Sequence, residues 1–296
     1  FYFANFKKEM YMKTKVTIIG LSGQSIFMNV NEFHKPGETK QVKELYIEPG
    51  GKGYNQAIAC NRFDMDVYYL TSVGNDEYGK YCEKVMNDCG INTTFIYKEL
   101  PTALATIITD DKGENQVSVY SGANDLLNLN DLESFKLNIK NSDILLVNNE
   151  IPYPVLKEAI TYAKKNNVYV ILNPAPNVYD IQELLSNIDL LIPNEVEAQY
   201  IYKKAIDDIV VDNEVIITLG KNGCKYLNKG ISKSYDAIKV KGIDSTGAGD
   251  VFCSAIASKI KDKDINKAIE FALKASSIHV TKKHVLNAIP YLKDIK

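Results

Sequence analysis

The chain has 296 residues, of which 45% are hydrophobic and 24% are charged, and its formal net charge is −2. This composition predicts a globular protein with a sizeable core, and the charge balance gives no general attraction to nucleic acids or anionic membranes. Arg62 is the only arginine, which argues against a bidentate arginine clamp for phosphates or guanine bases.

The N-terminal residues 1–14 lack the apolar core of a signal peptide. We expect them to be an extension ahead of the folded domain, with Met12 as a candidate for the natural start. No apolar run in the sequence approaches the roughly 18 residues of a membrane span. Five cysteines without a C-x-x-C pair, and three histidines without metal-ligand spacing, indicate buried thiols in a cytoplasmic protein rather than disulfides or a metal site.

The first half of the chain mixes α/β elements with a separate β-rich pattern. Apolar runs typical of buried strands lie at 15–20 and 67–74. The periodicity typical of helices lies at 54–63 and 75–90. Residues 25–48 and 94–121 instead show partial alternation, with a hairpin signal at 111–113. We expect these two segments to form one small β-sheet that acts as a mobile lid, the alternative being a sheet extension without a function.

The second half alternates regularly between apolar strands and amphipathic helices. The expected strands lie at 143–150, 168–176, 189–194 and 214–220, and the expected helices at 154–166, 195–202, 247–260 and 265–281. Continuous apolar strands that alternate with helices indicate a mostly parallel sheet covered on both faces. We therefore predict one α/β domain over residues 15–296, interrupted by the lid.

Four loops at the expected carboxyl ends of strands carry residues suited to chemistry, and in open α/β sheets such loops converge on one ligand site. In the first loop, Gly51 and Gly53 allow a ligand to approach the backbone closely, and Lys52 and Asn55 supply donors for hydroxyl groups. The loop fails the dinucleotide-binding pattern, and its alternative interpretation is a turn that caps a helix.

Two further loops suit a nucleotide. Asn194 and Glu197 stand three residues apart at a helix start, where they either hold the water shell of a magnesium ion or form the helix's capping box. Gly220 and Gly223 flank a polar turn after a buried strand. Backbone groups of that turn could contact nucleotide phosphates, although such turns are common.

The fourth loop, IDSTGAGDVFCSAIA at 243–257, resembles a phosphate-binding loop but leads into a carboxylate. The amides of Ala248, Gly249 and Asp250 at a helix N-terminus could form an anion hole for a transferring phosphoryl group. Asp250 could accept the proton of an attacking hydroxyl, and we expect the helix N-terminus to favour its ionised form. The alternative is an N-cap aspartate.

Seven motifs, in order along the chain, resemble the ribokinase family of carbohydrate kinases in the phosphofructokinase-B superfamily. They are KPGET, GGKGYNQA, GENQVSVYSGAN, LNPAP, PNEVEA, ITLGKNG and DSTGAGD, and the resemblance runs from Val16 to Pro290. It implies a ribokinase-like three-layer α/β sandwich with a mostly parallel central sheet and a small β-sheet lid. It also implies ATP and Mg²⁺ as requirements, K⁺ as an optional activator, and a homodimer formed through the lid.

The resemblance also implies roles for individual residues. Asp250 matches the family's catalytic base and Gly247 to Gly249 its anion hole. The positions that match sugar contacts are Gly51, Lys52, Gly53, Asn55 and Glu150. Asn194 and Thr218 to Gly223 match nucleotide positions, Glu197 matches a magnesium-associated glutamate, and Asp244 and Thr246 match part of a monovalent-cation site.

Three departures from the family pattern bear on the substrate and the cation. Gly23 and Ser25 stand where ribokinases carry an asparagine and an aspartate that grip adjacent sugar hydroxyls, so the sugar need not be ribose. Tyr54 replaces a usually small residue beside the sugar, where it could stack on a ring or narrow the pocket. His284 and Ala288 replace a glycine and a serine near the cation, which leaves potassium activation open.

These features predict an ATP-dependent kinase that phosphorylates a primary hydroxyl of a small sugar or sugar-like compound. A nucleoside kinase of the same fold, one for pseudouridine included, is the close alternative, because Tyr54 could support a base. A non-catalytic sugar or nucleotide sensor is less favoured, since it need not keep Asp250, Asn194 and Glu197.

Overall fold

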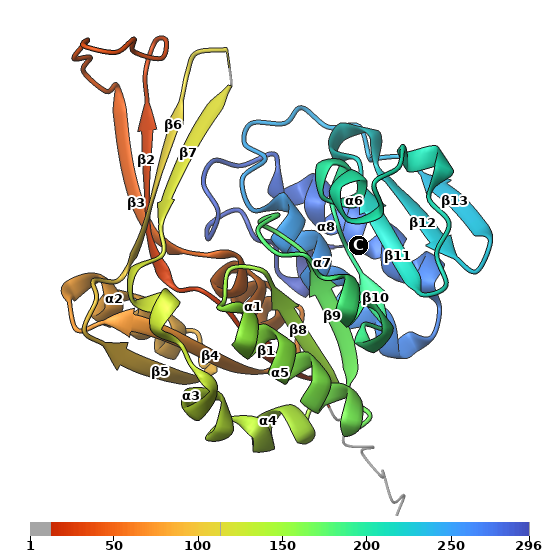
Figure 1. The fold of residues 1–296 in the computed structure, drawn as a ribbon. Helices are drawn as coiled ribbons and strands as arrows, with labels where there is room; N and C mark the ends of the chain where they lie inside the picture. Colours follow the sequence, from red (N-terminus) through yellow and green to blue (C-terminus); the bar gives the residue numbers. More distant parts are fainter. Residues whose placement is uncertain (1–12, 113, 296) are drawn as a thin grey trace, which may run out of the picture.

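The computed structural model describes residues 13–112 and 114–295, so most of the expected N-terminal extension lies outside the described residues. Within them, one sheet has nine strands in the order β13-β12-β11-β10-β9-β8-β1-β4-β5, and a second has four in the order β3-β2-β6-β7. Figure 1 shows the smaller sheet standing away from the body that the larger sheet and the helices form.

The larger sheet is mostly parallel, as predicted. Its strands are β1 (Lys15–Ile19), β4 (Asp66–Gly74), β5 (Asn92–Lys98), β8 (Ile144–Asn148), β9 (Tyr169–Asn173), β10 (Leu190–Leu191), β11 (Glu214–Thr218), β12 (Cys224–Asn228) and β13 (Ile231–Tyr235). Every pairing from β11 across to β5 is parallel, whereas β12 and β13 add an antiparallel edge. That edge hairpin was not predicted, because its strands are short and lack a long apolar run, and β13 is exposed at all its residues except Tyr235.

Helices cover both faces of the larger sheet. They are α1 (Lys52–Arg62), α2 (Glu77–Asp88), α3 (Leu129–Glu133), α4 (Lys136–Lys140), α5 (Tyr153–Lys165), α6 (Glu195–Tyr202), α7 (Ala248–Lys259) and α8 (Ile265–His279). One buried cluster joins α1, α2, α7 and α8 to one face of the sheet, and a second joins α3 to α6 to the other. Adjacent β1 residues divide between them, Ile18 in the first cluster and Ile19 in the second. The three-layer sandwich is therefore confirmed.

Short 3₁₀ turns connect several of these elements. They span Gly122–Leu126, Gln182–Asn187, Ile206–Asp208, Gly220–Asn222, Ile260–Asp262 and Leu292–Asp294. Among the described residues, no helix is both long enough and apolar enough to cross a membrane.

The smaller sheet contains β2 (Gly23–Asn29), β3 (Glu44–Gly50), β6 (Ala103–Thr109) and β7 (Asn115–Tyr120). Parallel pairing of β2 with β6 joins the two segments of the chain that were expected to form the lid. The second segment begins later than expected, because residues 94–98 belong to β5, which pairs with β4 at the edge of the larger sheet. An edge strand is only half buried, so its alternating pattern resembles that of a lid strand.

Helix α1 begins close to the carboxyl end of β1. A Cβ atom added to Gly53 would lie 2.6 Å from the Cα atom of Gly20, so this approach requires glycine. The close approach brings the loop ahead of α1 to the same edge of the sheet as the loops after β10 and β11. The sheet topology therefore gathers three of the four predicted loops at the carboxyl ends of the parallel strands.

Candidate functional site

The loop ahead of α1 is fixed by its backbone. Gly51 has φ of 118°, and a Cβ atom there would lie 2.2 Å from the carbonyl oxygen of Leu21, so other residues would be strained. The backbone N–H of Lys52 donates to Oε2 of Glu150 at 2.7 Å. Glu150 follows β8, so this bond joins two of the strand ends. Gly51, Lys52 and Glu150, predicted as sugar contacts, thus lie together.

Asp250 lies in the first turn of α7, and its side chain is buried. Asn55 donates from Nδ2 to Oδ2 of Asp250 at 2.9 Å, and Gln56 donates from Nε2 to Oδ1 at 3.4 Å. Behind this pair, Asn148 and Asn173 hydrogen bond with Gln56 at 3.4 Å each. The sequence analysis missed these three amides. Their positions at the ends of β8 and β9 and beside Asn55 were the available signal.

Four charged groups interact in this part of the molecule. Burial disfavours the charge of Lys52, but the carboxylates of Asp250, Glu150 and Glu197 outweigh that effect and raise the pKa of its ammonium. Burial raises the pKa of Glu150 to about 7, although Lys52 opposes the shift. Lys52 is therefore the countercharge that three carboxylates share.

We expected the helix N-terminus to favour the ionised form of Asp250, which would lower its pKa; the direction of that shift is wrong. Burial raises the pKa of Asp250, while Lys52 and the amides of Asn55 and Gln56 act against the shift. Removing a carboxylate from water disfavours its charged form, and for Asp250 this effect exceeds those of Lys52 and the two amides. Asp250 is therefore a stronger proton acceptor than an exposed aspartate.

The predicted anion hole is only partly available. Gly247, the residue before α7, has φ of 78° and requires glycine, and the N–H of Ala248 already donates to the carbonyl oxygen of Ser245 at 3.1 Å. The N–H groups of Gly249 and Asp250 donate to no acceptor among the described residues. These two free donors at a helix N-terminus can bind an anion.

An apolar pocket of about 460 Å³ lies beside these donors. Thr218, Gly220, Gly223 and Gly249, all predicted as nucleotide positions, line its rim. Lys221, within the predicted range of Thr218 to Gly223, also lines it. The sequence analysis missed other residues of its wall, which include Ala237, Ile238, Lys239, Val240, Phe252, Leu273, Ser276 and Ser277. A pocket with apolar walls and a polar mouth at a helix N-terminus has the shape and chemistry to hold a nucleotide.

Asn194 and Glu197 form the capping box of α6, which was the alternative interpretation. The N–H of Asn194 donates to Oε2 of Glu197 at 2.8 Å, and Oδ1 of Asn194 accepts from the N–H of Glu197 at 2.9 Å. Glu197 is nevertheless close enough to Lys52 and Asp250 for their charges to affect its pKa, which burial raises. In the described ranges, no group of three or more His, Cys, Asp and Glu side chains could hold a metal ion.

Two of the residues that depart from the family pattern lie at the base of the lid. Gly23 and Ser25 are in β2, paired with Gly50 and Glu48 of β3. Tyr54, in contrast, does not reach the site. Its ring is fully buried in the core, and its hydroxyl donates to the carbonyl oxygen of Cys82 at 2.9 Å.

The loop ahead of α7 holds Asp244 and Thr246 close to the end of α8. Oδ1 of Asp244 accepts from the N–H of Thr246 at 2.9 Å, and Oδ2 accepts from the N–H of His284 at 3.1 Å. The carbonyl oxygen of Thr246 lies 2.7 Å from Nε2 of His279, a buried residue that the sequence analysis did not single out. Burial lowers the pKa of His279, against the opposing effects of Thr246 and Asp244.

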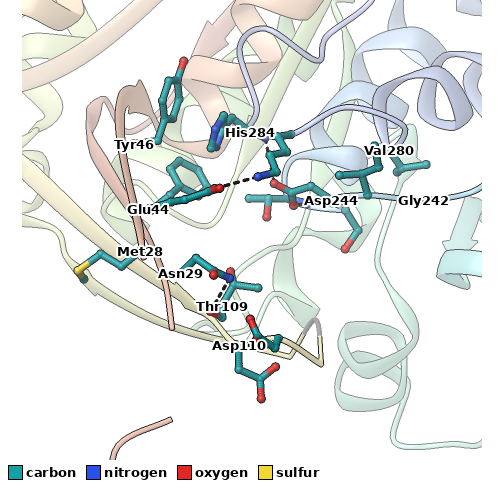
Figure 2. Close-up of a pocket in the computed structure, with 16 residues that line it drawn as sticks. Met28, Asn29, Glu44, Tyr46, Thr109, Asp110, Gly242, Asp244, Val280 and His284 are labelled. Carbon is teal, nitrogen blue, oxygen red and sulfur yellow. Dashed lines mark hydrogen bonds and ion pairs between the residues drawn. The ribbon is translucent and has the colours of Figure 1, made fainter. Parts of the chain in front are cut away.

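A second cavity, of about 510 Å³, separates the lid from this loop. Figure 2 shows Asn29, Thr109 and Tyr46 of the lid on one side, and Asp244 and His284 on the other. The rings of Tyr46 and His284 stack with centroids 3.7 Å apart. Lys283 pairs with Glu44 at 2.8 Å. The lid thus contacts the C-terminal loop, residues 280–290, beside the candidate site.

Comparison with known proteins shows which family the chain resembles. The model of the pfkB family carbohydrate kinases matches residues 13–291. A ribokinase of Staphylococcus aureus is 36% identical over 301 residues, which cover 96% of this chain and 99% of that protein. A deoxyribokinase of Salmonella typhi is 26% identical over 94% of this chain and 96% of its own length.

Solved structures agree with the sequence relatives. The structure of Arabidopsis thaliana ribokinase complexed with ribose and ATP superposes with a TM-score of 0.82 at 26% identity, covering 96% of this chain and 98% of that one. A family match over nearly the whole length, together with a relative of more than 30% identity, establishes the family. The chain belongs to the pfkB family of carbohydrate kinases.

Proposed function

We propose that this enzyme transfers the γ-phosphoryl group of ATP to a primary hydroxyl of a small sugar, with Asp250 as the base. The observation that carries the proposal is the position of Asp250. On one side, Asn55, a predicted sugar contact, donates a hydrogen bond to its carboxylate at 2.9 Å. On the other side, its neighbour Gly249 lines the candidate nucleotide pocket. A base between the two substrates is where phosphoryl transfer needs one.

In the proposed step, the hydroxyl oxygen of the sugar attacks the γ-phosphorus and the bond to the bridging oxygen of ADP breaks. The hydroxyl proton passes to the carboxylate of Asp250, whose raised pKa suits it to accept. The free N–H groups of Gly249 and Asp250 stabilise the charge on the transferring group. Lys52 compensates the negative charge of the carboxylates around it.

Mg²⁺ would enter with ATP rather than occupy a protein cage. This ion keeps several waters and binds substrate phosphates through few carboxylates. Glu197 fits such a role, because each oxygen of its carboxylate accepts one hydrogen bond from Asn194 and retains a lone pair. The ion would neutralise phosphate charge, and Glu197 would orient its water shell.

The sugar would be held by Lys52, Asn55 and Glu150, with Gly51 and Gly53 allowing close approach to the backbone. Oδ1 of Asn55 is buried and has no hydrogen-bond partner among the described residues, so a substrate hydroxyl is its natural donor. Gly23 and Ser25 offer less to the sugar than an asparagine and an aspartate would. A sugar with fewer hydroxyls, such as deoxyribose, therefore joins ribose as a candidate.

Tyr54 no longer supports the nucleoside kinase alternative, because its ring is buried in the core. The non-catalytic sensor remains distinguishable by experiment. ADP release is measured with Mg-ATP and a panel of pentoses, ketohexoses, nucleosides and pseudouridine. Release that depends on one sugar supports the proposal, whereas tight sugar binding without any ADP supports the sensor. Release with nucleosides alone would replace the sugar by a nucleoside.

We further propose that two copies of the chain pair through the lid. The lid strands expose the apolar side chains of Leu45, Ile47, Val117 and Val119, and unpaired β-edges with apolar side chains favour association. Sedimentation of the wild type and of an Ile47→Lys variant tests this. A dimer that dissociates in the variant supports the proposal, and a monomeric wild type at micromolar concentration contradicts it.

A further inference from the structure

His279 at the end of α8 is in direct contact with the loop that precedes α7. Its side chain is fully buried, and Nε2 lies 2.7 Å from the carbonyl oxygen of Thr246. A carbonyl oxygen can only accept a hydrogen bond, so Nε2 carries the proton and donates it. The ring is also close to Gly247, where a Cβ atom would lie 3.5 Å from Nε2. One imidazole therefore holds the turn that leads into the anion hole.

The carboxylate of Asp244 in this loop is also engaged by the protein itself. The two carboxylate oxygens of Asp244 accept from the N–H groups of Thr246 and His284, at 2.9 and 3.1 Å. The N–H of Ile243 donates to the carbonyl oxygen of Val280 at 2.7 Å, which ties the loop to the end of α8. The loop thus has an internal set of bonds that fixes its shape.

The C-terminal loop that faces it, residues 280–290, is held by buried Glu48 and by partly buried Arg62. Oε1 and Oε2 of Glu48 accept from the N–H groups of Val285 and Leu286, at 2.8 and 3.1 Å. Arg62 donates to the carbonyl oxygens of Leu286 and Ile289, at 2.6 and 2.7 Å. These carbonyl oxygens therefore point to a guanidinium instead of toward Asp244.

A monovalent cation at Asp244 and Thr246, which the family resemblance implies, does not fit this arrangement. An ion bound to the Thr246 carbonyl would face the N–H of His279, whose hydrogen carries a partial positive charge and already occupies that oxygen. Position 288, where a hydroxyl ligand would be expected from the resemblance, is an alanine. The Thr246 carbonyl and both carboxylate oxygens of Asp244 thus already accept hydrogen bonds from the protein, and a potassium ion would have to compete with these donors for them.

We propose that this kinase works without a monovalent cation, because the N–H of His279 holds the Thr246 carbonyl in the place of the ion. His279 is then a positioning residue, which keeps the amides of Gly249 and Asp250 directed at the transferring phosphoryl group. The inference rests on the proposed function, since it assigns the loop to phosphoryl transfer.

The test compares sugar-dependent ADP formation in tetramethylammonium, sodium and potassium salts at one ionic strength. The wild-type rate is expected to be the same in all three. His279→Ala should lower kcat roughly tenfold or more, as loss of a positioning hydrogen bond does, and potassium should restore part of the loss. His279→Gln should behave like the wild type, because its side-chain amide can donate to the same carbonyl.

Ile269→Ala is the matched control. Ile269 is fully buried on the same helix, so its truncation lowers stability without touching the loop, and the rate of this variant should not respond to potassium. If His279→Ala does not fold, the wild type, His279→Gln and the control still decide the question. Activation of the wild type by potassium over sodium, or a potassium response of Ile269→Ala equal to that of His279→Ala, overturns the proposal.

A second measurement separates this inference from the proposed function. The melting temperature of the wild type is recorded in the same three salts, and no potassium-specific rise is expected. This result would support the absence of a bound potassium ion even if no sugar gave ADP. In that case only the kinase proposal would fail. A potassium-specific rise in the wild type contradicts the inference whether or not the chain has kinase activity.

Discussion

Asn55 and Asp250 are 195 positions apart in the sequence, yet Nδ2 of Asn55 donates to Oδ2 of Asp250 at 2.9 Å. The bond joins the first turn of α1 to the first turn of α7. Oδ1 of the same amide is buried and has no hydrogen-bond partner among the described residues. This oxygen therefore belongs to a side chain that already contacts the carboxylate of Asp250. A substrate hydroxyl bound there can therefore be held by the amide while it gives its proton to Asp250.

Gly249→Ala should weaken ATP binding without lowering the stability of the fold. A Cβ atom at this position has no heavy atom within 4 Å, and alanine is favoured over glycine in a helix by about 0.5–1 kcal/mol. The melting temperature should therefore stay the same or rise. The methyl group would intrude on the nucleotide, and we expect KM for ATP to rise about tenfold, or ~1.4 kcal/mol.

The control for this variant is Ser258→Ala, near the far end of the same helix. It should leave KM for ATP unchanged. If Gly249→Ala binds ATP as tightly as the wild type does, the nucleotide does not approach α7 in the way proposed.

Glu150 should make the stability of the protein fall as pH rises. Burial raises its pKa in the folded state from 4.5 to about 7, so between these values the folded protein binds more protons than the unfolded chain. The free energy of unfolding therefore decreases with rising pH across that window and levels off above it. Glu150→Gln removes this contribution, and urea unfolding across the window should show a shallower decline for the variant.

An exposed residue supplies the control for the pH experiment. Glu77 is largely exposed on α2, so Glu77→Gln should leave the pH dependence as it is in the wild type. Parallel curves for the wild type and Glu150→Gln would mean that Glu150 is ionised in the folded protein throughout the window.

Lys52→Met should move the acid limb of the pH–rate profile to higher pH. The ammonium of Lys52 opposes the burial that raises the pKa of Asp250 and of Glu150, so its loss raises both values further. The measurement is kcat/KM against pH for the preferred sugar. Lys52→Arg, which keeps the charge, should keep the limb in place, and an unshifted limb in Lys52→Met would show that Lys52 does not control the base.

Gly23 should not tolerate the asparagine that ribokinases carry at this position. A Cβ atom there would lie 2.5 Å from the carbonyl oxygen of Ala103 and 2.8 Å from its Cβ atom. We expect Gly23→Ala to lower the free energy of unfolding by about 1–3 kcal/mol, the usual cost of overpacking. Ser25→Asp, at a half-buried position, should fold and serve as the control, and a stable Gly23→Asn variant would contradict the argument.

The sequence predicted the loops of the site better than the contacts within it. Two of the predicted loops follow the parallel strands β10 and β11, so strand order alone brings these two loops to one edge of the sheet. Gln56 and Asn173 lie within the motifs GGKGYNQA and LNPAP but were given no role there, and Asn148 lies outside the seven motifs. The network of these three amides around Asp250 depends on how α1 packs against α7. The pKa of Asp250 was predicted in the wrong direction for the same reason, since burial cannot be read from neighbours in sequence.

Tyr54 shows a different limit. Its position beside the glycine loop suggested a ligand contact, but Ala57 and Ile58, three and four residues later, share its buried helix face. The helical period was the signal that could have placed it in the core. The second lid segment was predicted too long because β5, an edge strand of the larger sheet, is half buried like a lid strand.

The most direct test of the central claim is the rate of ADP formation with Mg-ATP and a sugar for the wild type, Asp250→Asn and Asp189→Asn. Asp189 precedes β10 at the opposite end of the parallel strands, so its variant controls for the substitution itself. The account predicts that Asp250→Asn keeps its fold and its affinity for ATP but loses about 10²–10⁴ in kcat, while Asp189→Asn remains active. Turnover near the wild-type rate in Asp250→Asn would contradict the account.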